Sequence, residues 1–110
     1  VWGDGSPLRQ VIYSEDLAKL IIWSLNNWTS DDPFMAINPI EDSILDIAKI
    51  ICNTFDIKDN DIIFDPTKPM GQHKKPAITN APVGFEFKNL NDGIKDTVEW
   101  FIQNYKEVRK

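Results

Sequence analysis

The chain has 110 residues, a formal net charge of −5 and a single cysteine, Cys52. This length fits one domain, and so short a chain would gain stability by packing against further structure. The acidic balance argues against binding to nucleic acid or to an anionic membrane, because both need a basic face. One cysteine excludes an internal disulfide and favours a reducing, cytoplasmic location.

The ends and the apolar runs give two further expectations. The first residue is Val1, which suggests a piece of a longer protein, and no basic, apolar leader pattern follows it. The longest apolar run, residues 20–23, is far too short to span a bilayer, so we expect no membrane association.

The first half of the chain predicts strand, helix and strand. Residues 11–13 form a β-prone run, and Ser14 then offers a hydroxyl that could cap a helix, with acidic residues behind it. One helical stripe contains the apolar residues Leu17, Leu20, Ile21, Leu25 and Trp28. Residues 31–33 interrupt the pattern, and residues 34–37 predict a second strand.

The second half predicts helix, strand, a long loop and a last helix. Ser43 and Asp46 resemble a capping box with Asp in place of Glu. A predicted buried face follows at Ile44, Ile47, Ala48, Ile51 and Phe55. Residues 62–64 predict a strand, residues 65–82 a loop, and residues 89–105 a helix capped by Asn89 with Asp92. Its apolar stripe contains Ile94, Val98, Phe101, Ile102 and Tyr105. This order favours an α/β or α+β class.

Several catalytic patterns are absent from the sequence. Gly3 and Gly5 lack a third glycine at position 8 and a preceding strand, so they form no dinucleotide fingerprint. Neither Tyr13 nor Tyr105 has a lysine four residues later. With one histidine and one cysteine, a metal site of the usual ligands is not expected. These absences predict no dinucleotide fingerprint, no Tyr–Lys pair and no metal ligand within these 110 residues.

Two isolated reactive side chains leave alternatives open. His73 carries an imidazole that could act as an acid or base, but a lone loop histidine is more often an ordinary polar residue on the surface. Cys52 lies beside the apolar stripe of a predicted helix, where packing is the simpler interpretation.

Two loops carry candidate binding residues. Trp2 and Arg9 flank a segment rich in glycine and proline, and a guanidinium is a preferred partner of phosphate. By spacing alone, a packed indole and a surface ion pair are the simpler explanation. The loop 65–75 places Lys68, Lys74 and Lys75 in an acidic chain, either as a phosphate clamp or as a solvated basic segment.

Taken together, these segments resemble the extended short-chain dehydrogenase/reductases that act on nucleotide sugars. Residues 1–18 carry the pattern VWGxGxPxRxxIYxxDLA, which many sugar epimerases and dehydratases share. Residues 64–75 carry FDxTKPxGxxKK, which is more particular to the branch that forms GDP-L-fucose. That branch usually has Asp where this chain has Met70.

The resemblance implies an α/β fold in which residues 1–110 form one C-terminal substrate-binding lobe with a late piece of the Rossmann domain. An N-terminal NADP-binding Rossmann domain would precede it. The resemblance also implies that Trp2, Arg9 and Lys75 contact the GDP-sugar substrate, with Arg9 and Lys75 at its diphosphate.

In this branch a GDP-linked 4-keto-6-deoxymannose is epimerised and then reduced with NADPH, usually by a homodimer. The catalytic groups and the glycine-rich cofactor motif precede the matching region. The resemblance therefore implies no catalytic residue and no cofactor-binding residue within residues 1–110, and we expect this chain alone to be inactive. Another nucleotide-sugar epimerase or dehydratase, or a non-catalytic interaction domain derived from one, remains an alternative.

Overall fold

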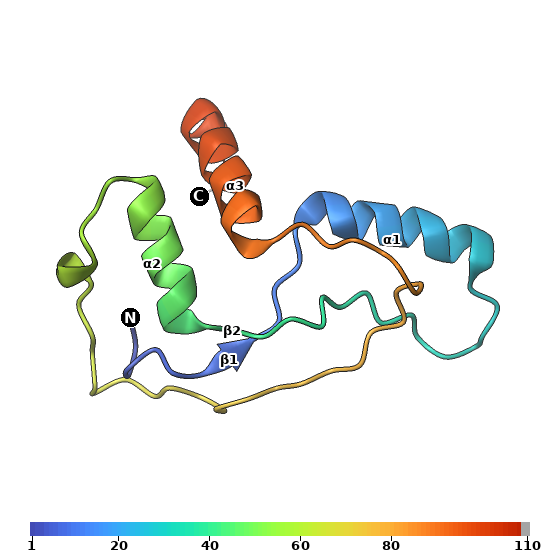
Figure 1. Cartoon of the computed structure of the whole chain (residues 1–110), viewed down its shortest axis with the longest axis horizontal. Helices are drawn as coiled ribbons and strands as arrows, with labels where there is room; N and C mark the ends of the chain where they lie inside the picture. Colours follow the sequence, from blue (N-terminus) through green and yellow to red (C-terminus); the bar gives the residue numbers. More distant parts are fainter. Residues whose placement is uncertain (109–110) are drawn as a thin grey trace.

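The computed structural model describes residues 1–108, which combine helices with a small sheet (Figure 1). The elements are β1 (Leu8–Arg9), α1 (Ser14–Asn27), β2 (Asp42–Ser43), α2 (Ile44–Thr54), the 3-10 turn η1 (Asp59–Asp61) and α3 (Leu90–Asn104). β1 and β2 pair antiparallel, so that Leu8 lies opposite Ser43 and Arg9 opposite Asp42. The mixture of helix and strand agrees with the expected α/β class.

The predicted helices form close to their expected positions, because their start signals are local. Ser43 Oγ accepts a hydrogen bond from Asp46 N at 2.9 Å, and its hydroxyl donates to Asp46 Oδ2 at 2.7 Å. Asn89 Oδ1 likewise accepts from Asp92 N at 2.9 Å. Ser14 was expected to cap α1, but the cap position is Tyr13, which makes no side-chain cap bond.

The three predicted strands at residues 11–13, 34–37 and 62–64 are wrong. Apolar runs need a neighbouring strand to form a ladder. Within residues 1–108, the runs 11–13 and 34–37 bond to scattered groups instead, and the pairing next to residues 62–64 is limited to one isolated parallel bridge between Trp2 and Asp65. Met35 N donates to Asn80 Oδ1 at 2.8 Å, while Asn80 N donates to Met35 O at 2.9 Å. Val11 O accepts from the side chain of Asn38 at 3.1 Å.

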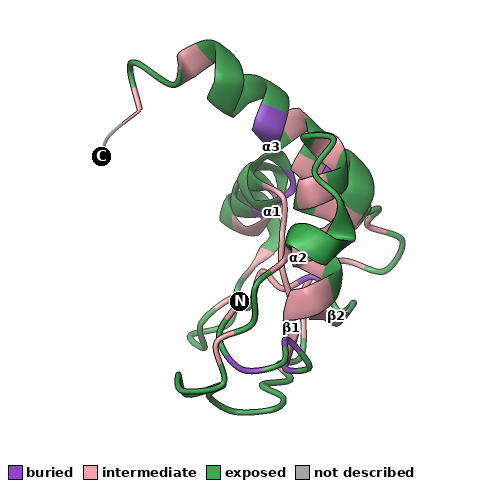
Figure 2. Cartoon of the chain, turned by 90° about the vertical axis from the view of Figure 1, so that its left-hand side faces the viewer, coloured by how far each residue is buried: buried purple, intermediate pink, exposed green. Residues whose placement is uncertain are grey.

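The apolar helix faces are less buried than the sequence predicts (Figure 2). Among the aliphatic and aromatic side chains of residues 1–108, proline aside, only Leu20 and Val98 are buried, at 0% and 8% exposed, whereas Ile51 remains 39% exposed. The faces of α2 and α3 do meet, but they line an open cavity of about 510 Å³. The radius of gyration is 16.3 Å, against about 13 Å for a compact chain of this length.

The loop over residues 65–82 forms as predicted and runs alongside the start of the chain (Figure 1). Gly3 N donates to Asp65 O at 2.8 Å, and Leu8 N donates to His73 O at 2.8 Å. The segments 1–10 and 63–77 are therefore tied together along their length. No helix within residues 1–108 has the length and apolar character needed to cross a membrane.

Candidate functional site

Arg9 ends β1 with one side of its guanidinium occupied and the other side open. Arg9 Nη1 donates to Leu8 O at 2.6 Å and to Gln72 O at 3.0 Å. The Nε and Nη2 edge makes no hydrogen bond to residues 1–108. Gly71 leaves room beside this edge, since a Cβ there would lie 3.6 Å from Arg9 Nη2. A guanidinium edge of this kind can donate two parallel hydrogen bonds to one anion.

Lys75 reaches the same place from the long loop. Arg9 and Lys75 both line a cavity of about 240 Å³, together with Gln10, Ile12, Ala36, Ile37, Asn38 and Ala77. Lys75 is exposed and has no ion pair within the described residues. Its neighbour Lys74 differs, because its Nζ lies 2.7 Å from Glu41 Oε2. The cavity thus has two cationic side chains without a carboxylate partner in residues 1–108.

Asp42 is the acidic residue directly opposite Arg9 in the sheet, yet the two form no salt bridge. Partial burial raises the pKa of the Asp42 carboxyl, and the negative charge of Asp46 raises it further. Because no carboxylate of residues 1–108 forms a salt bridge with Arg9, its charge is available to the cavity.

Trp2, the third predicted substrate contact, does not line this cavity. Its side chain is 61% exposed, and Lys68 Nζ lies 6.0 Å from the ring centroid. The next residue, Gly3, has φ +66°, and a Cβ on it would stand 1.9 Å from Met70 Cγ. Met70, which replaces the usual Asp, thus packs against the turn that carries Trp2.

Other candidate chemistry finds no support in the geometry of residues 1–108. Gly3 and Gly5 have left-handed φ values of +66° and +76°, but their turn leads into β1 and not into a helix. They therefore do not fit the pyrophosphate cradle of a dinucleotide site. His73 is exposed, and Cys52 is a half-buried free thiol on α2. The described residues contain no cluster of three or more His, Cys, Asp or Glu that could hold a metal ion.

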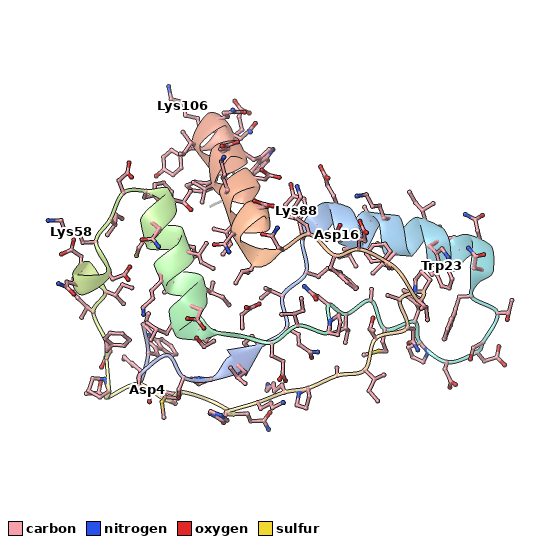
Figure 3. The ribbon with its side chains drawn as sticks, viewed as in Figure 1. Asp4, Asp16, Trp23, Lys58, Lys88 and Lys106 are labelled. Carbon is pink, nitrogen blue, oxygen red and sulfur yellow. The ribbon has the colours of Figure 1, made fainter. Side chains whose placement is uncertain are left out.

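Two polar residues, Gln10 and Asp16, form hydrogen bonds with distant parts of the chain that the local sequence did not reveal. Gln10 bonds to both backbone groups of Ala77. Asp16, which the sequence suggested only as a helix-start residue, is 3% exposed and accepts from Lys88 N at 2.7 Å (Figure 3). Both partners lie far along the chain, so no spacing pattern could have identified them.

Lys88 adds a second contact between the beginnings of α1 and α3. Its Nζ lies 4.3 Å from the centroid of the Tyr13 ring and also pairs with Asp96. The hydrogen bond that Lys88 Nζ donates to Asp96 Oδ2 raises the pKa of Lys88. Tyr13 and Lys88 line the larger, mostly apolar cavity, which contains none of Trp2, Arg9 and Lys75.

Comparisons with known proteins identify relatives of a single kind. No family model matches the chain. It is 39% identical to a GDP-L-fucose synthase of Dictyostelium discoideum and 37% identical to a probable GDP-L-fucose synthase of Drosophila melanogaster. Each match covers 100% of this chain and 36% of the relative.

A solved structure agrees with these relatives. The crystal structure of a GDP-L-fucose synthetase from Naegleria fowleri bound to NADP aligns over 100% of this chain and 36% of its own length. The TM-score is 0.92 at 35% identity. The comparisons therefore confirm the resemblance to nucleotide-sugar-modifying enzymes inferred from the motifs. Over its full length, this chain is similar in sequence and in fold to GDP-L-fucose synthases, and it spans about a third of their length.

Proposed function

We propose that this chain is the C-terminal, substrate-binding part of a GDP-L-fucose synthase, and that Arg9 and Lys75 bind the diphosphate of its GDP-linked keto-sugar. The observation that carries the proposal is the shared 240 Å³ cavity, in which the open edge of Arg9 and the unpaired Lys75 converge. In the whole protein, which would be an NADP-dependent epimerase and reductase, these groups hold the substrate.

The two cations suit a diphosphate because they act differently. The Nε–Nη2 edge of Arg9 gives two hydrogen bonds in a fixed plane, whereas the Lys75 ammonium is a compact charge on a flexible stem. Trp2, on the neighbouring loop, offers an exposed indole face to the sugar or the base. Contacts remote from the reacting carbons position the sugar, so that their loss lowers the rate as well as the affinity.

The exposed apolar surface supports the domain assignment in this proposal. Ile22 and Leu25 on α1 are 62% and 80% exposed, and the run 34–37 has no neighbouring strand within residues 1–108. We assign both to the late piece of the Rossmann domain, packed against the N-terminal domain that binds NADP. By the same resemblance, the whole enzyme is a cytoplasmic homodimer.

The test is calorimetric titration of the complete enzyme with the GDP-sugar, GDP, GMP and NADPH. A hydrogen bond to a charged group contributes about 1.5–3 kcal/mol, or roughly 10- to 150-fold in affinity. Arg9→Ala should weaken GDP-sugar binding by that factor, and Arg9→Lys should recover part of it. Lys75→Ala should weaken GDP binding but barely affect GMP. NADPH affinity should stay nearly constant in each variant.

Lys74→Ala is the matched control, because Lys74 is already paired with Glu41. It should leave GDP affinity nearly unchanged. If folded Arg9→Ala and Lys75→Ala proteins bind GDP-sugar as tightly as the parent, the diphosphate site is not here. Because a diphosphate is common to many nucleotide sugars, titration with a UDP-sugar tests whether another sugar nucleotide is the substrate.

A further inference from the structure

The Gln10 side chain, beside the candidate site, forms hydrogen bonds with both backbone groups of one distant residue, Ala77. Ala77 N donates to Gln10 Oε1 at 2.8 Å, and Gln10 Nε2 donates to Ala77 O at 3.2 Å. Both bonds are partly buried. A pair of bonds to the N–H and C=O of one residue fixes its orientation, as in an antiparallel ladder. Gln10 directly follows β1, and its side chain thereby adds a pair of hydrogen bonds beyond the end of that strand.

The two Gln10–Ala77 hydrogen bonds anchor the loop on one side of Lys75, and a second anchor lies on its other side. On the other side, His73 O accepts from Leu8 N at 2.8 Å, and Gln72 O accepts from Arg9 Nη1 at 3.0 Å. Between the anchors lie Lys74, Lys75 and Pro76. Proline fixes its own φ and disfavours helical backbone at the preceding residue. The backbone of Lys75 is therefore held at both ends and restricted at its own position.

We propose that Gln10 is a positioning residue that holds Lys75 at the substrate diphosphate; this inference rests on the function proposed above. Arg9 and Gln10 are consecutive, so one short segment both supplies the first cation and places the second. A single loose anchor would leave the ammonium of Lys75 free to sample positions away from Arg9. Because the two Gln10 bonds already restrict the loop, less conformational entropy is lost when the substrate binds, and this increases affinity.

The test is a double-mutant cycle on GDP affinity in the complete enzyme. Gln10→Met keeps side-chain length but removes both hydrogen bonds, and Gln10→Leu also removes both without adding charge to the cavity that Gln10 lines. We expect Gln10→Met to weaken GDP binding about two- to tenfold, the effect of one typical hydrogen bond. In the Lys75→Ala background the same change should have almost no effect, because the cation that it positions is gone.

Two readouts separate positioning from general support of the fold. GMP affinity should be unchanged in Gln10→Met if Lys75 contacts the second phosphate, and the Ala77 amide should exchange faster with solvent. Gln10→Leu should show the same coupling to Lys75, which keeps the test valid if Gln10→Met does not fold. Lys74→Ala in place of Lys75→Ala should leave the effect of Gln10→Met intact.

The outcomes of the double-mutant cycle distinguish the positioning role of Gln10 from the diphosphate site itself. Equal losses from Gln10→Met with and without Lys75 would overturn the positioning role, since the two residues would then act independently. Unchanged GDP affinity in Gln10→Met, with Lys75→Ala still weakening GDP binding, would also overturn it while leaving the diphosphate site standing. No effect of Lys75→Ala itself would remove the proposed site, and the role of Gln10 with it.

Discussion

Arg9 and Lys75 carry positive charge into the same cavity, but the chain prepares them in different ways. Arg9 is fixed by its own side chain, because Nη1 is bonded to Leu8 O and Gln72 O. Lys75 is fixed through its backbone, between the bonds at His73 and Ala77. An Arg9 substitution therefore removes both a binding group and a loop contact, whereas a Lys75 substitution removes only the charge.

Asp42 gives a pH-dependent prediction at the residue scale. Burial, and then the charge of Asp46, raise the pKa of Asp42 above its ordinary value of 3.8. A raised carboxyl pKa means that folding disfavours the ionised form, so this cost is fully present above the folded pKa. It disappears as the pH falls below 3.8.

Asp42→Asn removes this cost, so the variant should be the more stable protein at neutral pH. The stability gap should close at about pH 3, where the carboxyl is neutral in both folded and unfolded chains. Urea unfolding of both proteins at the two pH values measures it. A variant less stable than the parent at neutral pH would show that a favourable interaction of Asp42 outweighs its burial.

At the scale of elements, the start of α2 depends on one hydroxyl. Ser43→Ala removes the acceptor of Asp46 N and should cost about 0.5–2 kcal/mol of helix stability. Ser14→Ala is the matched control, because the Ser14 hydroxyl makes no hydrogen bond within the described residues. Urea unfolding compares the two variants. Equal losses in both would mean that the cap bond contributes nothing beyond the change of side chain.

The junction between α1 and α3 depends on the buried Asp16. Asp16→Ala leaves Lys88 N without its acceptor, and an unpaired buried donor costs about 1–3 kcal/mol. The Lys88 amide should then exchange with solvent about 5- to 150-fold faster, as measured by hydrogen exchange. Asp16→Asn keeps an acceptor oxygen and should show a smaller increase. An unchanged exchange rate in Asp16→Ala would mean that water or another group replaces the carboxylate.

For the whole molecule, the small number of buried apolar side chains and the missing cofactor motifs lead to a prediction about NADPH binding and activity. The residues described here offer no glycine cradle at a helix start and no Tyr–Lys pair. We predict that the chain alone binds NADPH no more tightly than millimolar and shows no reductase activity. Fluorescence titration with NADPH tests this, with the complete enzyme as the positive control. Micromolar affinity in the isolated chain would contradict the assignment of the cofactor site to an N-terminal domain.

The sequence by itself determined the three helices, the long loop and the family resemblance. Helical hydrogen bonds close within four residues, so the caps at Ser43 and Asn89 and the apolar periodicity behind them are visible locally. The family resemblance carried by the motifs around Arg9 and Lys75 likewise predicted a shared ligand group. Glycine and proline in the segment 65–82 were enough to indicate a loop.

Tertiary structure decided the strands, the burial and the arrangement of the site. The run 34–37 has strand-forming residues, but a strand also requires a partner strand. The described residues offer Met35 only Asn80 and the Thr79 hydroxyl. Ile51 faces the open cavity between α2 and α3, so a correct helical stripe did not mean a buried one. Gln10 meets Ala77 across a separation of 67 residues, and only a folded chain brings such groups within hydrogen-bonding distance.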